Sequence, residues 1–128
     1  MTDTINLMIV DDSPRARLAL AAFLSLQAGI NIVANASNGL EAVTIMQDRV
    51  PHVVLMDMKM PVMDGVEATR IIKRRWPGVR IVILSMYSDY ITEALASGAD
   101  DFLLKGCSME ELMFAITGRS DETQTFAQ

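Results

Sequence analysis

Five polar residues of this 128-residue chain directly follow short apolar runs, and together their types could handle phosphate. Asp11 and Asp12 follow NLMIV, Asp57 follows VVLM, Ser85 follows RIVIL, and Lys105 follows DFLL. Aspartate is a poor strand former, and its charge is costly to hold against a core. A carboxylate at the end of the most hydrophobic run therefore indicates a functional requirement.

The chemistry of this set is coherent. Three carboxylates within ~4 Å would repel one another by ~4 kcal/mol per pair at an effective dielectric of 20, so they need a cation. A hard, all-oxygen site of this kind suits Mg²⁺. Aspartate can attack phosphorus to form an acyl phosphate, and Ser85 and Lys105 could then donate a hydrogen bond and offset the added charge. We interpret Asp57 as a phosphate acceptor.

The apolar runs predict the sheet that would bring these residues together. They lie at 6–10, 31–36, 53–56, 80–84 and 101–104, and three are almost continuously apolar, which is typical of strands buried on both faces. Helical patterns lie between them. This alternation predicts an α/β, doubly wound fold, with a five-stranded parallel sheet and helices on both faces. In such sheets, ligands bind outside the carboxyl ends of the strands.

Capping residues are expected to open four of the five helical segments, namely Ser13, Asn38, Asp64 and Ser108. The fourth segment is expected to begin at about Ser88. The second, third and fifth segments carry apolar residues at helical spacing.

Two helices and one basic run carry more detailed expectations. The first helix is expected to end near Gly29 and to bury Leu18. The fourth, over 88–96, is expected to pack through an apolar face formed by Ile91, Ala94 and Leu95. The basic run 73–75 is interpreted as a solvated helix end, where cations complement the helix dipole.

Composition restricts the functional class. The length fits a single domain, here predicted as residues 1–118, with 119–128 as a polar tail or the start of a linker. The net charge of −5 disfavours direct binding to nucleic acid or anionic membranes. No apolar run approaches the ~20 residues of a membrane span, and the start does not read as a signal peptide. The single cysteine, Cys107, fits a cytoplasmic location.

Four segments resemble the receiver domain of two-component response regulators: IVDDSP, DMKMPVMDG, the ILS strand end and FLLKG. The resemblance covers about residues 5 to 118, and the LSM and FLLKG segments are most similar to the NarL/FixJ-type group. Receivers of that group usually precede a LuxR-type helix-turn-helix domain. The resemblance implies a flavodoxin-like (CheY-like) fold and a role in transcription regulation.

The resemblance also assigns roles. It implies that Asp57 takes a phosphoryl group from a histidine kinase or phosphotransfer protein, and that Mg²⁺ is held by Asp11, Asp12, Asp57 and the backbone carbonyl of Lys59. By the same resemblance, Ser85 and Lys105 contact the phosphate and Phe102 changes rotamer on activation, with phosphorylation changing dimerisation or the hold on an output domain. Lys59 and Tyr87 flank the acceptor, and we expect them to tune phosphoryl lifetime. The family often has proline after the lysine, whereas this chain has Gly106.

One alternative is a haloacid-dehalogenase-like phosphatase, which also uses an aspartyl phosphate and Mg²⁺. Its nucleophile lies on the first strand in a DxD pattern, whereas here the acidic pair comes first and Lys59 stands two residues after Asp57. The sequence therefore favours a phospho-acceptor that is not an enzyme, apart from slow loss of its own phosphoryl group.

Overall fold

A computed structural model describes residues 4–118 of the chain. The segment 119–128, expected to be a tail or linker, lies outside the described residues. Five parallel strands form one sheet in the order β2-β1-β3-β4-β5. The strands are β1 (Ile5–Val10), β2 (Ile30–Ala36), β3 (Val53–Asp57), β4 (Arg80–Ser85) and β5 (Asp101–Leu104).

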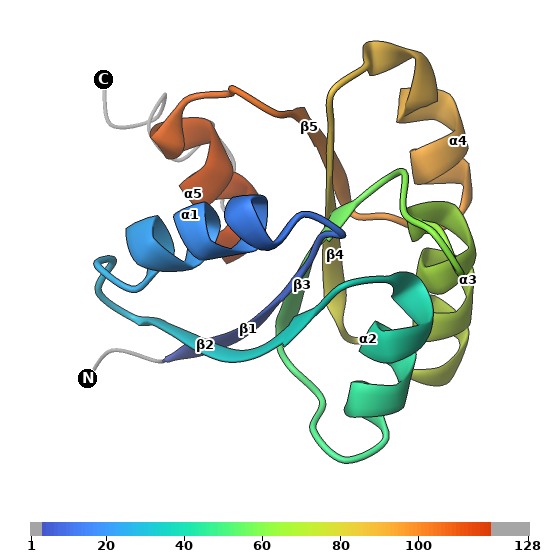
Figure 1. The fold of residues 1–128 in the computed structure, drawn as a ribbon, viewed down its shortest axis with the longest axis horizontal. Coiled ribbons are helices and arrows are strands. Elements are labelled where there is room, and N and C mark those ends of the chain that lie inside the picture. Colours follow the sequence, from blue (N-terminus) through green and yellow to red (C-terminus); the bar gives the residue numbers. More distant parts are fainter. Residues whose placement is uncertain (1–3, 119–128) are drawn as a thin grey trace.

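Helices cover both faces of this sheet, as predicted (Figure 1). The α-helices are α1 (Pro14–Leu24), α2 (Gly39–Met46), α3 (Gly65–Arg75), α4 (Ile91–Ala96) and α5 (Met109–Thr117). A 3₁₀ turn, η1 (Ser88–Tyr90), precedes α4. Helices α1 and α5 pack on one face, and α2, α3 and α4 pack on the other.

The buried stretches of the three central strands, residues 7–10, 53–56 and 81–84, are apolar because each contributes to two cores. Along β3, Val54 and Met56 pack in the core beneath α2 and α3, whereas Val53 and Leu55 pack in the core beneath α1 and α5. Strands β1 and β4 alternate in the same way. Successive side chains of a strand point to opposite faces, so a strand covered on both sides has no position for a polar residue until it ends.

Capping side chains fix where several helices begin. Ser13, Asn38, Asp64 and Ser108 each accept a hydrogen bond from a backbone N–H in the first turn of the following helix. The fourth helix was predicted to begin at about Ser88, but Ser88 begins the 3₁₀ turn and α4 starts at Ile91.

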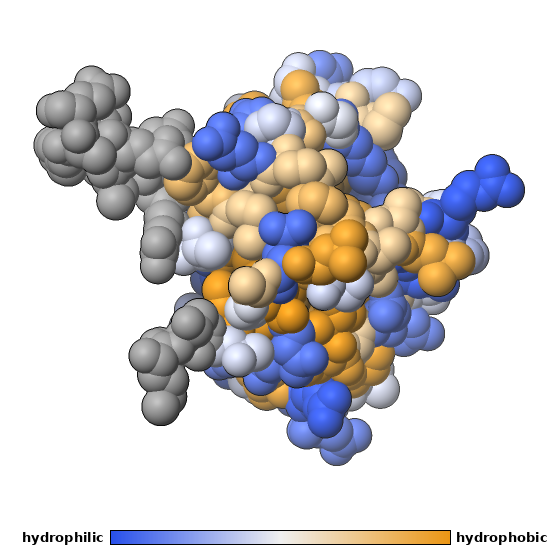
Figure 2. Space-filling model, turned by 90° about the vertical axis from the view of Figure 1, so that its left-hand side faces the viewer, coloured by the Kyte–Doolittle hydropathy of each residue, from blue (hydrophilic) through white to orange (hydrophobic). Residues whose placement is uncertain are grey.

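Three predictions about helices were wrong. Leu18 is 71% exposed, and Figure 2, which faces the side carrying α1 and α5, shows apolar surface over much of it. Ile91 and Leu95 are 42% and 46% exposed, because α4 is short and lies beside β5 at the edge of the sheet, where only Ala94 reaches the core. Helix α1 ends at Leu24, five residues before Gly29. In the described part of the chain, no helix is both long and apolar enough to cross a bilayer.

Candidate functional site: an acidic cluster at the carboxyl ends of β1 and β3

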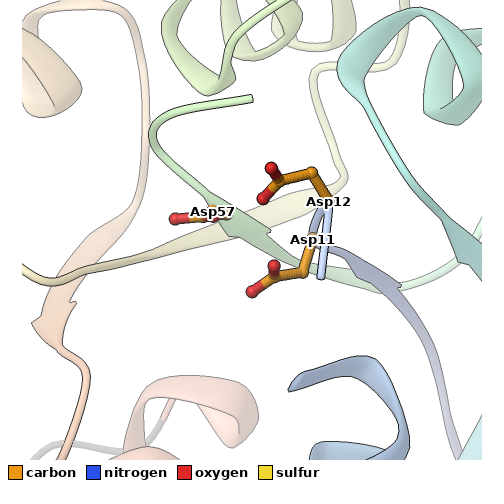
Figure 3. Close-up of side chains that lie close together, drawn as sticks. All are labelled: Asp11, Asp12 and Asp57. Carbon is orange, nitrogen blue, oxygen red and sulfur yellow. The ribbon is translucent and has the colours of Figure 1, made fainter. Parts of the chain in front are cut away.

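Adjacent parallel strands bring the three predicted carboxylates together. Asp57 is the last residue of β3, and Asp11 and Asp12 directly follow β1, its neighbour in the sheet. One carboxylate oxygen from each of the three residues lies within 4.8 Å of the others. Figure 3 shows the three carboxyl groups side by side and pointing to the same side of the strand ends.

Lys105 supplies the positive charge at this cluster. It follows β5 directly, and its Nζ lies 2.9 Å from Oδ2 of Asp11 and 3.4 Å from Oδ1 of Asp57. Its backbone N–H donates to the carbonyl oxygen of Ser85 (2.7 Å), which ties the end of β5 to the end of β4. The sequence predicts Lys105 at this edge, and the structure brings its ammonium onto the carboxylates of Asp11 and Asp57.

Burial and like charge disfavour the ionised form of Asp57. Its pKa is raised above the ordinary aspartate value, first by burial and then by the neighbouring charge of Asp11. Lys105 and the backbone N–H of Met58 act in the opposite direction without cancelling the rise. A carboxylate whose charge is this poorly compensated is one that a bound cation would stabilise.

The same contacts affect Lys105. Burial lowers its pKa, but the hydrogen bond to Asp11 and the charges of Asp57 and Asp11 outweigh burial, and the net pKa is raised. Lys105 therefore stays protonated at neutral pH.

Backbone groups hold two of the three carboxylates in place. Asp11 is buried, accepts from the N–H of Ser13 (2.9 Å), and has its carbonyl bound by Nη1 of Arg17 (2.6 Å). Asp57 accepts from the N–H of Met58 (2.8 Å). Asp12 is exposed, and within residues 4–118 it makes no side-chain hydrogen bond or ion pair. The cluster thus has two fixed carboxylates and one that faces solvent.

The hydroxyl of Ser85 is buried at the end of β4 and is engaged locally. It donates to the carbonyl oxygen of Tyr87 and accepts from the N–H of Tyr87, both at 3.1 Å. Phe102 is half-buried and lines a hollow of about 450 Å³ together with Ser88, Ile91 and Lys105. Tyr87 itself is largely exposed.

Lys59 and Gly106 complete the predicted set. Lys59 is exposed, and its ammonium lies over the ring of Tyr90, 4.8 Å from the ring centroid. Gly106 has a φ of +96°. Proline holds φ near −65°, so the loop after Lys105 follows a path that the proline common in this family could not take.

The importance of Gly65 to the site was not identified from the sequence, which showed only that this residue follows the capping Asp64. A Cβ on Gly65, the first residue of α3, would collide with the backbone oxygen of Asp57, and the Gly65 N–H donates to the carbonyl oxygen of Met58 (2.9 Å). The available signal was the Asp64-Gly65 pair seven residues after the acceptor. Only the fold shows that α3 begins against the acceptor itself.

Comparisons with known proteins agree with this arrangement. Residues 7–117 match the model of the response regulator receiver domain, and the chain belongs to this family. The transcriptional regulatory protein LnrK of Bacillus subtilis (strain 168) is 38% identical over 114 residues, which are 88% of this chain and 52% of that protein. The response regulator protein VraR of Staphylococcus saprophyticus is 34% identical over 114 residues, 88% of this chain and 54% of that protein. The chain thus spans about half the length of these curated relatives.

Solved structures give the same result. A two-component response regulator of the LuxR family from Aurantimonas sp. SI85-9A1 superposes with a TM-score of 0.84 at 30% identity, over 91% of this chain and 88% of that one. A DNA-binding response regulator of the LuxR family from Staphylococcus aureus has a TM-score of 0.82 at 28% identity, over 89% of this chain and 97% of that one. The chain is a receiver domain of the LuxR/NarL type, and the phosphatase alternative gains no support.

Proposed function

We propose that this domain accepts one phosphoryl group on Asp57, from a histidine kinase or a phosphotransfer protein. The observation that carries the proposal is the convergence of three carboxylates within 4.8 Å, with Lys105 on two of them. Among these carboxylates, Asp57 stands at the centre of the rim, at the end of β3 between β1 and β4. Asp57 is therefore the carboxylate that residues at the ends of both neighbouring strands can contact.

The donor set fits Mg²⁺. The carboxylates of Asp11, Asp12 and Asp57 offer hard oxygen ligands, and the backbone carbonyl of Lys59 is the fourth protein ligand that the family resemblance suggests. An ion held there would neutralise negative charge on the acceptor and on an incoming phosphoryl group. The pKa of Asp57 is raised by burial and by Asp11, so the ionised carboxylate would be stabilised by a nearby positive charge such as that of Mg²⁺.

The transfer itself places few demands on the protein. An oxygen of Asp57 attacks phosphorus, the bond from phosphorus to the donor's imidazole nitrogen breaks, and the imidazole leaves with the bonding electron pair. Lys105, already 3.4 Å from Asp57, remains beside the new phosphoryl oxygens and offsets their charge. Because the product stays on Asp57 until it hydrolyses, the domain is a switch with slow self-dephosphorylation and no further enzymatic turnover.

Ser85 is the residue through which phosphorylation would change the local conformation. A hydroxyl has one hydrogen to donate, and that of Ser85 now goes to the carbonyl of Tyr87. Donating it to a phosphoryl oxygen frees the turn that leads into η1 and α4. Phe102 could then move in the adjoining hollow, and the population of α4 positions would shift.

The output would be a change in protein contacts. Phosphorylation adds about 1.5 to 2 negative charges at one rim of the sheet, and the chain has a net charge of −5, a sign opposed to DNA binding. We therefore propose that this chain does not bind DNA itself. It would act in the cytoplasm by changing its dimerisation or its hold on a LuxR-type DNA-binding domain, to control transcription.

Acetyl phosphate with Mg²⁺ tests the proposal, with borohydride trapping and mass spectrometry to locate the adduct. We expect one phosphoryl group, on Asp57, in the native chain and in the control variant Asp101→Asn, and none in Asp57→Asn. Labelling that persists in Asp57→Asn would disprove the assignment.

A further inference from the structure

Lys59 is the charged residue nearest in sequence to the acceptor, yet within the described residues it pairs with no carboxylate. The ion pairs of Asp11 and Asp57 in this region go to Lys105. The Lys59 ammonium instead lies on the face of Tyr90, 4.8 Å from the ring centroid, which is cation–π geometry. Lys105 and Lys59 thus have different partners.

Tyr90 is suited to hold a flexible lysine. It is half-buried, packs against the core beneath α2 and α3, and meets the ring of Tyr87 edge to face, with the ring centroids 6.4 Å apart. Lys59, by contrast, is exposed, and its ammonium sits on a four-carbon stem. The fixed partner of the pair is the ring, so the ring decides where the ammonium rests.

The location of that ammonium matters to the site. Asp12 has no cationic partner within residues 4–118 and faces solvent, where a divalent ion would arrive. An unrestrained Lys59 ammonium, two residues after Asp57 in the chain, would be drawn to this negative charge. It would then compete with the ion by like-charge repulsion and by occupying carboxylate oxygens.

We propose that Tyr90 is a positioning residue that holds the Lys59 ammonium off the acidic cluster and so keeps the cluster open to Mg²⁺. The inference rests on the proposed function for the identity of the ion. The contact joins the loop after β3 to the turn after β4, so Tyr90, in the turn after β4, affects the charge around the carboxylates at the ends of β1 and β3.

The first measurement is the nuclear magnetic resonance signal of the lysine ε-methylene groups. The chain has three lysines, so labelled lysine gives three signals, and single substitutions assign them. We expect the Lys59 protons to be shifted upfield by the ring of Tyr90 in the native chain and in Tyr90→Phe, and to lose that shift in Tyr90→Leu. Tyr87→Leu is the control, because it removes the neighbouring ring and should leave the Lys59 shift in place.

The second measurement is Mg²⁺ affinity, by calorimetric titration with the metal alone. A competing state lowers affinity in proportion to its population, so Tyr90→Leu should bind Mg²⁺ about two- to fivefold more weakly, the range of an exposed cation–π contact. Tyr90→Phe should match the native chain. Adding Lys59→Met to Tyr90→Leu should restore native affinity, because the competing ammonium is gone while the residue-59 carbonyl remains.

The rescue separates positioning from a structural role. If Tyr90 only supported the fold, removing Lys59 would not restore binding in Tyr90→Leu, and that result would overturn the inference. So would a Lys59 signal without the upfield shift in the native chain, which is measured even if Tyr90→Leu folds poorly. A different result would contradict the proposed function: the native chain would not bind Mg²⁺, or Asp12→Asn would bind Mg²⁺ as tightly as the native chain.

Discussion

The amino and carboxyl ends of the sheet differ in how well their acidic side chains are paired with cations. Near the amino ends of the strands, Lys73 pairs with Asp100 at 2.9 Å and also donates to the carbonyl of Val79, and Arg80 lies 3.7 Å from Asp101. There Asp100 and Asp101 each pair with a separate cation. Lys73, expected to be part of a solvated helix end, is instead an anchor between α3 and the start of β5, so that expectation was wrong for this residue.

At the carboxyl ends, charge is left uncompensated. Among residues 4–118, Lys105 is the one cation that forms ion pairs with this cluster, and it reaches Asp11 and Asp57 but not Asp12. The pKa of Asp57 is raised by burial and by Asp11. A protein selected only for stability would pair or remove these groups. This imbalance supports the proposal that phosphoryl transfer takes place at the carboxyl end of the sheet, whereas the ion pairs at the amino end stabilise the fold.

The largest expected difference between the two ends concerns two glycines. Gly65→Ala would force a Cβ against the backbone oxygen of Asp57, and we expect a loss of about 3 kcal/mol in the free energy of unfolding. Gly78, near the amino end of β4, has open space around its Cβ position, so Gly78→Ala should be neutral or stabilising by about 0.5 kcal/mol. Urea denaturation measures both, and equal losses would show that the close approach at Gly65 is not what the fold depends on.

The second-largest expected difference is in the effect of carboxylate substitutions at the two ends of the sheet on Mg²⁺ affinity. Asp12→Asn removes the solvent-facing carboxylate, and we expect Mg²⁺ to bind about tenfold more weakly, which is about 1.4 kcal/mol. Asp101→Asn removes a carboxylate of the balanced end and should leave affinity unchanged. If both variants bound alike in calorimetric titrations, the acidic cluster would not be the metal site.

The uncompensated charge should also affect stability. The pKa of Asp57 is higher in the folded chain than its ordinary value of 3.8, so ionising this group costs folding free energy. That cost is complete above the folded pKa and absent below the unfolded one. Asp57→Asn should therefore be more stable than the native chain at pH 7, by on the order of 1 kcal/mol.

This gain should disappear as the pH falls below about 4. Urea denaturation at pH 7 and near pH 3 tests it, since the gain should be present only at the higher pH. A less stable Asp57→Asn at pH 7 would mean that the contact with Lys105 outweighs the repulsion from Asp11.

The smallest expected effect is that of Ser85→Ala on metal affinity. The Ser85 hydroxyl is engaged with Tyr87 and offers no charge to the ion, so Mg²⁺ binding should stay within about twofold of native. The change caused by phosphorylation in the amide spectrum of residues 86–96 should nevertheless be lost. A tenfold fall in Mg²⁺ affinity in this variant would show that Ser85 belongs to the metal site and is not the switch.

Much of this could be predicted from sequence because the signals are local. Strand positions followed from apolar runs, and the carboxyl-end rule for parallel sheets placed Asp11, Asp12, Asp57, Ser85 and Lys105 on one rim. The burial of helix α4 was predicted less well, since α4 lies at the edge of the sheet. A helical pattern shows which side chains share a face, but it does not show how much of that face a neighbour covers.

The sequence by itself determined which residues end strands, which residues cap helices, and which side chains could hold a cation and a phosphoryl group. Tertiary structure alone decided the partners. It placed the start of α3 against Asp57 through Gly65, Lys73 on Asp100, and Lys59 on Tyr90. The physical reason is that these contacts join residues from different loops, whose separation depends on how helices pack across the sheet, and no local pattern in the chain records that distance.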